Sequence, residues 1–389
     1  MNKPPLRIGL IGSGFMGACH ANAFRAVSGL FDLPLEPVLE MIADVDDITA
    51  VHAAERFGFR RSTGDWRTLV DDPSVDIVDI TAPNVLHHEI GMAAIRAGKA
   101  VYCEKPLANT VADCAELVAA AAAKGVPTAI GYNYLKNPMI ALAREIIGSG
   151  EIGEVVGFRG IHAEDYMTDP TAPFSFRNEP VGGGVLADLG SHIIAMARFL
   201  VSEIREVCGQ LHTVVTERPV VKGARGAHYR DDNGAVSEMR QITTDDQARF
   251  LCSFANGASG VIEASWVAQG RKMQLGFELT GTKGSLAFTA ERLNELQIST
   301  AGQPRGREGF KTIWAGPEHE PYAAFCPAPG HQLGFNDLKV IEVRDLITAL
   351  ATPERKPWPD FAEGLTVQRV IEAVRVSAEQ RGWAAVEGT

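Results

Sequence analysis

Two side chains in distant parts of the sequence are suited to moving a proton or stabilising the charge it leaves. The first is Lys105, which stands in Glu104-Lys105-Pro106, directly after the apolar run of residues 100–103. An ammonium group at the carboxyl end of a strand can donate a hydrogen bond to a substrate oxygen and lower the pKa of that oxygen. The alternative is that Lys105 only pairs with Glu104 or caps a loop, and the spacing favours neither.

The second is His192, which follows the cluster Gly182-Gly183-Gly184 and lies four residues after Asp188. The pattern predicts a helix over residues 185–200 with both side chains on one face and a buried apolar stripe on another. A histidine beside a carboxylate in a partly dry cleft can act as a general base near neutral pH. A core histidine with one hydrogen bond is the alternative, but three glycines, which let a backbone approach something closely, favour a ligand site.

A glycine-rich turn near the N-terminus predicts a nucleotide site. Residues 6–17 read as a short apolar strand that breaks into Gly12-x-Gly14-x-x-Gly17 and opens an amphipathic helix. Gly12 permits the turn, Gly14 lets the backbone approach a pyrophosphate, and Gly17 lets the helix pack close to the strand. The N–H groups and the positive dipole end of that helix favour an anion.

The next predicted strand, residues 37–43, ends in Asp44, whose carboxylate can accept both hydroxyls of the adenosine ribose. Val45, Asp46 and Asp47 follow, so a 2′-phosphate would meet three carboxylates without a neighbouring cation. The predicted cofactor is therefore NAD rather than NADP.

Composition narrows the class of protein. The chain has 389 residues, 46% of them apolar, and a formal net charge of −11, which allows two or three domains and disfavours nucleic acid as a partner. Its six cysteines are scattered, without disulfide or zinc spacing, which is typical of reduced thiols in a cytoplasmic protein, and no metal is predicted. No apolar run reaches the roughly 18 residues that a membrane span needs, and the N-terminus does not resemble a signal peptide.

The order of predicted elements indicates an α/β chain of two domains. Over residues 1–131 strands and helices alternate, which predicts a Rossmann domain with a parallel sheet covered on both faces. Residues 132–389 predict an α+β domain with an open, largely antiparallel sheet, whose free face favours a homodimer or homotetramer. Residues 216–246 are polar and turn-rich, which indicates a long excursion or lid.

Read together, four motifs resemble the glucose–fructose oxidoreductase/inositol dehydrogenase/MocA family. They are the Gly12 turn, Thr81-Ala82-Pro83-Asn84-x-x-His87, Glu104-Lys105-Pro106 and Asp188-x-x-x-His192. The resemblance implies nicotinamide held between the two domains, a sugar or polyol above it, and Lys105 and His192 as the catalytic pair, with Asp188 holding the substrate. Many members carry an aspartate three residues after the histidine, where this chain has Ala195, so another group must orient the imidazole or the base is weaker.

A closer resemblance is to bacterial pyranose and cyclitol dehydrogenases of the scyllo-inositol/L-glucose and levoglucosan type. It rests on Gly131-Tyr-Asn-Tyr134, Glu164-Asp165-Tyr166, Phe176-Arg177, and Pro329-Gly330-His331 with the following Gly334-Phe335-Asn336-Asp337. Asp165 and Arg177 could hydrogen-bond vicinal hydroxyls and Tyr166 could pack on a sugar ring, although each could equally be a surface pair or a core aromatic.

The sequence thus predicts an NAD-dependent dehydrogenase that oxidises a secondary hydroxyl of a cyclic polyol or pyranose. The predicted catalytic residues are Lys105, His192 and Asp188. The predicted cofactor-binding residues are Gly12, Gly14, Phe15, Met16, Gly17, Asp44, Thr81, Pro83, Asn84, His87, Glu104 and Lys105. The predicted substrate-binding residues are Lys105, Asn133, Asp165, Tyr166, Arg177, Asp188 and His192. The alternatives are a glycosidase that retains NAD on the same scaffold, and a non-catalytic nucleotide or sugar sensor.

Overall fold

The chain forms two compact units. The structure, a computed structural model, describes residues 3–221, 236–352 and 354–388. The first unit comprises Met1–Lys136 and Leu333–Thr366, and the second comprises Asn137–Gln332 and Val367–Thr389. This partition differs from the predicted division after residue 131, because a segment from the C-terminal part of the chain packs with the first unit.

The first unit is built on a six-stranded parallel sheet in the order β3-β2-β1-β4-β5-β6. Its strands are β1 (Pro5–Ile11), β2 (Glu36–Ala43), β3 (Arg61–Thr63), β4 (Ile77–Ile80), β5 (Ala100–Glu104) and β6 (Thr128–Gly131). All four residues of β4 are buried, as expected of a strand covered on both faces. The predicted parallel sheet is confirmed, and β3 is an edge strand that the sequence pattern did not reveal.

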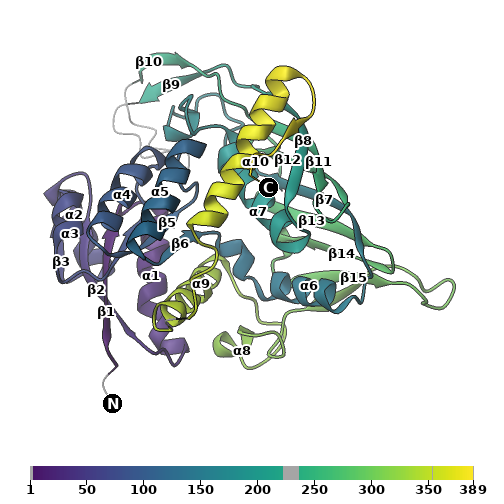
Figure 1. Cartoon of the computed structure of the whole chain (residues 1–389), viewed down its shortest axis with the longest axis horizontal. Helices are drawn as coiled ribbons and strands as arrows, with labels where there is room; N and C mark the ends of the chain where they lie inside the picture. The colour runs from purple at the N-terminus through teal and green to yellow at the C-terminus, as the bar shows by residue number, and fades with distance from the viewer. Residues whose placement is uncertain (1–2, 222–235, 353, 389) are drawn as a thin grey trace. The chain divides into compact units, whose positions relative to one another are not determined.

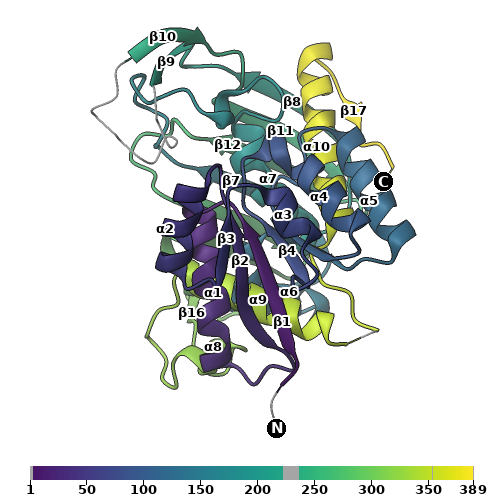
Figure 2. The same cartoon turned by 90° about the vertical axis from the view of Figure 1, so that its left-hand side faces the viewer.

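Helices cover both faces of this sheet. They are α1 (Phe15–Leu30), α2 (Asp47–Phe57), α3 (Trp66–Asp71), α4 (His87–Arg96), α5 (Val111–Lys124) and α9 (Phe335–Leu350). Helix α1 packs against α2 and α9, while α3, α4 and α5 lie next to one another (Figures 1 and 2). The ends of α2 follow local chemistry, because the Asp46 side chain accepts a hydrogen bond from the Thr49 N–H and Gly58 adopts a left-handed conformation with φ 83°.

The second unit contains a mixed nine-stranded sheet in the order β16-β15-β14-β13-β7-β12-β11-β8-β17. Its strands are β7 (Val155–Ala163), β8 (Ile204–His212), β11 (Gln247–Phe254), β12 (Ser259–Ser265), β13 (Gln274–Gly281), β14 (Gly284–Thr289), β15 (Glu295–Thr300), β16 (Lys311–Trp314) and β17 (Ala384–Ala385). Only the pair β7 and β12 is parallel among the strand pairs of this sheet in the described residues, so the predicted, largely antiparallel sheet is confirmed.

Helices lie on one face of the nine-stranded sheet. The helices assigned wholly or partly to this unit are α6 (Pro138–Ser149), α7 (Ser191–Leu200), α8 (Tyr322–Phe325) and α10 (Phe361–Gln380), of which α10 begins in the first unit. Helix α7 packs on β7, β12 and β13. The burial of β11 alternates residue by residue, so every second side chain points away from the core. The opposite face of the sheet is therefore open among the described residues.

The predicted excursion over residues 216–246 is described only at its ends. Strands β9 (Glu217–Val221) and β10 (Val236–Gln241) pair antiparallel in a small sheet of their own. The predicted lid falls largely on residues 222–235, which lie outside the described residues. In the described part of the chain, no helix has the length and apolar character needed to cross a membrane.

Candidate active site

The predicted residues of the first unit follow the carboxyl ends of its parallel strands. Gly12 follows β1, Asp44 follows β2, Lys105 follows β5 and Asn133 lies just beyond β6. In an open parallel sheet these ends share one edge, and the order of strands reverses between β1 and β4. Ligands of such sheets bind at that edge near the point of reversal.

The three glycines of the first turn have the separate roles expected of a dinucleotide site. Gly12 has φ 99°, and a Cβ there would lie 2.9 Å from the Thr81 carbonyl carbon. A Cβ on Gly17 would lie 2.1 Å from the Gly12 carbonyl oxygen, so helix and strand can pack this closely only without a side chain. A Cβ on Gly14 would meet nothing within 4 Å, which leaves open space beside the backbone.

The first turn of α1 is suited to an anion. Its N-cap is Gly14, no side chain caps it, and the turn carries no acidic residue. The helix N-terminus therefore presents backbone N–H groups and a positive dipole end to the open space. These features fit the pyrophosphate of a dinucleotide.

Asp44 is fixed next to that turn. One carboxylate oxygen accepts a hydrogen bond from the Ser13 N–H at 2.8 Å, and the other accepts one from the Val45 N–H at 2.7 Å. Each carboxylate oxygen has a second lone pair for a ribose hydroxyl. The geometry supports the predicted role of Asp44.

Two predicted cofactor residues hold the surrounding loops. The Thr81 hydroxyl lies 2.7 Å from the Gly12 carbonyl oxygen. The buried His87 ring has its two nitrogens 2.7 and 2.9 Å from the carbonyl oxygens of Pro106 and Ala82. The ring thereby ties the loop after β4 to the loop after β5, so the geometry supports anchoring of these loops more than direct contact with the cofactor.

Glu104 points into the first unit. One carboxylate oxygen lies 2.8 Å from His20 Nε2 and 2.8 Å from Lys339 Nζ. The other oxygen accepts a hydrogen bond from the Lys105 backbone N–H at 3.2 Å. Both oxygens of this predicted cofactor residue therefore have protein donors, and its charge is paired with His20 and Lys339 instead of with the Lys105 side chain.

Asn133 has a feature expected of a ligand-binding side chain. Only 2% of the residue is exposed, and its amide nitrogen has no hydrogen-bond acceptor in the protein. A buried amide without an acceptor is costly. An oxygen of a bound ligand would satisfy it.

In the second unit, Asp188 and His192 lie on successive helical turns of different kinds. A π-helical turn, Leu186–Gly190, carries Asp188 and is followed by α7 with His192, where the sequence predicted one α-helix over residues 185–200. Such π turns often occur at functional sites. The predicted apolar stripe of Leu189, Ile193, Met196 and Leu200 is buried, as expected.

A buried carboxylate holds the start of this helix. Asp245 accepts a hydrogen bond from the Leu186 N–H at 2.7 Å, and a Cβ on Gly184 would lie 2.2 Å from the other Asp245 oxygen. A Cβ on Gly183 would lie 2.3 Å from the Glu179 carbonyl oxygen. The glycine cluster was predicted to let the backbone approach a ligand, but at these two positions the close neighbours are the protein's own groups.

Asp188 is held by two of the predicted substrate residues. One of its carboxylate oxygens accepts hydrogen bonds from Arg177 Nε at 2.8 Å and the Tyr166 hydroxyl at 3.0 Å. Burial and the charge of Asp188 raise the pKa of Tyr166 well above its usual value, so the phenol stays a donor. Burial would lower the pKa of Arg177, but the attraction of Asp188 outweighs it and raises the pKa. Asp188, Tyr166 and Arg177 thus form one polar cluster.

His192 is 8% exposed, and its ring packs edge-on against His162, with the ring centroids 5.6 Å apart. His162 is itself fixed, because its nitrogens lie 2.9 Å from the Leu189 carbonyl oxygen and 3.1 Å from a Glu164 carboxylate oxygen. Ala195, three residues after His192, is buried. His162 is 30 positions from His192 and belongs to none of the motifs, so the sequence did not predict that the two rings are neighbours.

Asp165 has different partners from the Asp188 cluster. Its carboxylate accepts hydrogen bonds from Lys272 Nζ at 2.7 Å and the Gly270 N–H at 3.0 Å. The geometry therefore supports its role in substrate binding less than that of Tyr166 and Arg177.

Comparisons with known proteins decide the family. Residues 6–132 match the model of the oxidoreductase family with an NAD-binding Rossmann fold, and residues 140–287 match that of the GFO/IDH/MocA C-terminal domain. The chain belongs to the GFO/IDH/MocA oxidoreductase family. Its first unit is an NAD-binding Rossmann domain, and the chain is an enzyme of the NAD-dependent sugar dehydrogenase family, which argues against a non-catalytic sensor.

Similar proteins include a levoglucosan dehydrogenase from Pseudarthrobacter phenanthrenivorans, which is 39% identical over 381 residues, or 97% of each chain. A solved levoglucosan dehydrogenase in complex with NADH and levoglucosan has a TM-score of 0.92 at 38% identity, covering 99% of this chain and 100% of that one. An NAD binding oxidoreductase from Klebsiella pneumoniae has a TM-score of 0.91 at 42% identity over the same shares. A more distant inositol dehydrogenase homologue from Azotobacter vinelandii, with a TM-score of 0.80 at 23% identity, shares the fold.

The structure also shows buried groups in this GFO/IDH/MocA protein that the sequence did not single out. His20 lies one turn after Gly17 on the buried face of α1, so its spacing from the glycine turn was a usable signal. Lys339 and Glu342 have the i, i+3 spacing of an ordinary surface pair, and nothing in the sequence marks them as buried. Across the described residues, no group of three or more histidine, cysteine or acidic side chains could hold a metal ion.

Two substitutions in the glycine turn test the separate roles of Gly14 and Gly17. Gly17→Ala should lower the free energy of unfolding by about 1–3 kcal/mol, because the new methyl group meets backbone that cannot move aside. Gly14→Ala should cost less than about 1 kcal/mol, as expected for a helix N-cap, yet weaken NAD binding by tenfold or more by filling the open space. Thermal melting and titration calorimetry with NAD measure the two effects. Equal NAD affinity in Gly14→Ala and wild type would contradict the role given to Gly14.

Proposed function

We propose that this enzyme oxidises a secondary hydroxyl of a pyranose or cyclic polyol with NAD, the first unit binding the cofactor and the second the sugar. The observation that carries the proposal is the cluster in which Tyr166 and Arg177 fix Asp188, one helical turn before His192. A carboxylate held in this way keeps lone pairs for sugar hydroxyls. The levoglucosan dehydrogenases among its relatives support the substrate class, including anhydrosugars.

In the proposed reaction, His192 accepts the proton of the hydroxyl that becomes a carbonyl group. Lys105 donates a hydrogen bond to the same oxygen and stabilises its developing negative charge. Asp188 orients a neighbouring hydroxyl. When bound, NAD supplies the acceptor for the hydride that leaves the carbon, so the products are a ketone, NADH and a proton.

The test is a substrate panel followed in the absorbance band of reduced nicotinamide. Levoglucosan, L-sorbose, myo-inositol and the D- and L-hexoses are offered with NAD, and we expect NADH with at least one of them. His192→Ala should then lower kcat by about 100- to 10,000-fold, the usual contribution of general acid–base catalysis. His88→Ala is the matched control, because His88 is partly exposed and pairs with Glu116 on the surface of the first unit.

Two outcomes contradict the proposal. Wild-type turnover in His192→Ala would remove this residue from the mechanism. Release of sugar from a glycoside without net NADH, with no oxidation anywhere in the panel, would favour the glycosidase.

Asp44 predicts the choice of cofactor. NAD at 100 times its Kd should stabilise the folded protein by about 2.7 kcal/mol, seen as a higher melting temperature. NADP at the same concentration should stabilise it much less, because its 2′-phosphate would approach the Asp44 carboxylate. Asp44→Ala should reduce the difference between the stabilisation by NAD and the stabilisation by NADP. Equal stabilisation of the wild type by both would contradict this role of Asp44.

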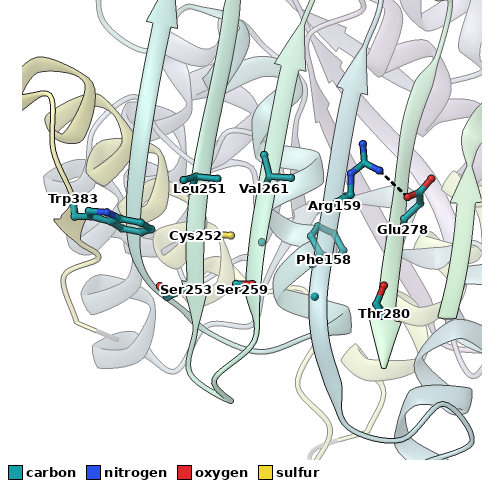
Figure 3. Close-up of a pocket in the computed structure, with 12 residues that line it drawn as sticks. Phe158, Arg159, Leu251, Cys252, Ser253, Ser259, Val261, Glu278, Thr280 and Trp383 are labelled. Carbon is teal, nitrogen blue, oxygen red and sulfur yellow. Dashed lines mark hydrogen bonds and ion pairs between the residues drawn. The ribbon is translucent and has the colours of Figure 1, made fainter. Parts of the chain in front are cut away.

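We also propose that the open face of the nine-stranded sheet binds a second copy of the chain. Figure 3 shows Leu251 and Val261 on neighbouring strands, with Trp383 at one side and the Arg159–Glu278 ion pair at the other. Leu251 and Trp383 are each 51% exposed and line the same hollow as Val261, so this face presents several apolar side chains together. The five strands of this sheet that have seven or more residues, β7, β8, β11, β12 and β13, present on the order of 650 Å² at about 4.8 Å spacing. This is near the roughly 800 Å² per partner of a standard interface.

Leu251→Glu should disrupt this assembly by placing a charge in the middle of the apolar surface. Size-exclusion chromatography with light scattering should show a dimer or tetramer for the wild type and a smaller species for the variant. Met239→Glu is the control, since Met239 is 52% exposed on β10, outside this sheet. A monomeric wild type, or a Leu251→Glu variant with unchanged mass, would contradict the proposal.

A further inference from the structure

A network of six polar side chains is buried within the first unit. One of its members is Glu104, the residue before Lys105. All six side chains are buried and come from α1, β4, β5 and α9. They are His20, Asp79, Tyr102, Glu104, Lys339 and Glu342. Three carboxyl groups thus share the interior with a lysine and a histidine.

His20 connects two of the carboxylates. Its Nδ1 lies 2.9 Å from both oxygens of Asp79, and its Nε2 lies 2.8 Å from Glu104. Burial would lower the pKa of His20, but the attraction of Asp79 and the two hydrogen bonds outweigh burial and raise it. The ring also stacks on Tyr102, with centroids 4.7 Å apart. Both ring nitrogens face carboxyl groups, and burial also raises the pKa of Asp79, so His20 and Asp79 hold one proton as a pair.

Lys339 is the second basic residue of this network. Its Nζ lies 2.8 Å from Glu104, 2.6 Å from Glu342 and 3.0 Å from the Tyr102 hydroxyl, which itself donates to Glu342. Burial opposes the charged form, yet Glu104 and Glu342 raise the pKa of Lys339 above its usual value. Lys339 and His20 in turn outweigh burial and hold the pKa of Glu104 well below its usual value.

Stability alone does not explain such a network. Removing several charges from water costs free energy that their mutual attraction only partly returns, and apolar side chains of similar volume are often as stable or more stable. Glu104 suggests another role. It receives one donor from α1 and one from α9, and its remaining oxygen binds the Lys105 backbone N–H.

The neighbouring strand is shaped to admit this carboxylate. A Cβ on Gly131, the residue paired with Glu104 in β6, would lie 2.6 Å from the oxygen that binds His20 and Lys339. Three other elements of the first unit, α1, α9 and β6, therefore meet one side chain at the end of β5.

We propose that His20 and Lys339 are positioning residues that fix Lys105 through Glu104. The inference rests on the proposed role of Lys105 in the dehydrogenase reaction. With both donors present, the Glu104 carboxylate cannot rotate, and the backbone of Lys105 is held at the edge of the sheet. With one donor removed, Glu104 gains freedom and the Lys105 ammonium loses its defined position. A misplacement of about 1 Å can lower a catalysed rate by about 100-fold.

Two double substitutions remove one donor each without changing the balance of charge. Lys339→Met with Glu342→Leu replaces one buried pair by apolar side chains. His20→Phe with Asp79→Leu replaces the other and keeps an aromatic ring on Tyr102. The matched control is Lys136→Met with Asp345→Leu, an ion pair of 2.9 Å that also involves α9 but does not contact Glu104.

The first measurement is steady-state kinetics. Each network variant should lose at least tenfold in kcat, with smaller changes in the KM values for NAD and sugar, because the proposed binding groups other than Lys105 are untouched. Each network variant leaves the buried Glu104 with one donor fewer, so its melting temperature should fall, and the kinetics are compared at a temperature at which every variant is folded. The control variant should match the wild type in kcat.

The second measurement is amide hydrogen exchange of the peptide that spans residues 101–108, which needs no substrate. Both network variants should exchange at least tenfold faster in this peptide than the wild type and the control. Because there are two network designs, the test can still be made if one of them folds poorly. Unchanged exchange and unchanged kcat in a folded network variant would overturn the proposal. If the wild type oxidises no sugar, the proposed function has failed, and the exchange measurement alone decides whether the network holds the Lys105 segment.

Discussion

The ion pair between Glu104 and Lys339 joins residues 235 positions apart and connects α9 to strand β5 of the first unit. Lys339 lies on α9, which the sequence places among the C-terminal residues, yet α9 packs against α1 of the Rossmann sheet. A buried lysine without a carboxylate would be costly, so α9 must dock where Glu104 and Glu342 can receive it. This explains why Leu333–Thr366 belongs to the first unit.

The two units position their proposed catalytic side chains in the same way. In the first, the buried Glu104 carboxylate accepts the Lys105 backbone N–H, and in the second, the buried Asp245 carboxylate accepts the Leu186 N–H at the start of the turn that carries Asp188. Each carboxylate also lies where a glycine leaves room for it. A backbone N–H bound to a buried carboxylate places the side chains of that segment more accurately than a mobile loop could. Catalysis requires such accuracy.

Patterns that depend on local chemistry were predictable from the sequence. The glycine turn, Asp44 at the end of β2, and Gly58 at the end of α2 each follow from one residue type in one backbone conformation. The network around Glu104 was not predictable, because its partners are distant in sequence and Lys339 with Glu342 reads as an exposed pair. The glycines before Asp188 predict that another group approaches the backbone closely. The sequence alone does not show whether that group is a ligand or, as the structure shows for Gly184, the Asp245 carboxylate.

The arrangement around Asp188 bears on how this enzyme gains rate. One oxygen of Asp188 accepts hydrogen bonds from both Arg177 and Tyr166. A carboxylate whose donors are in place does not need to reorganise in the proposed binding of a sugar hydroxyl. Preorganised polar groups are usually the largest source of catalytic stabilisation. The buried His162, held by Leu189 and Glu164, is a second fixed group beside the His192 ring. In the proposed mechanism, the cost of ordering these polar groups is met during folding and not during substrate binding.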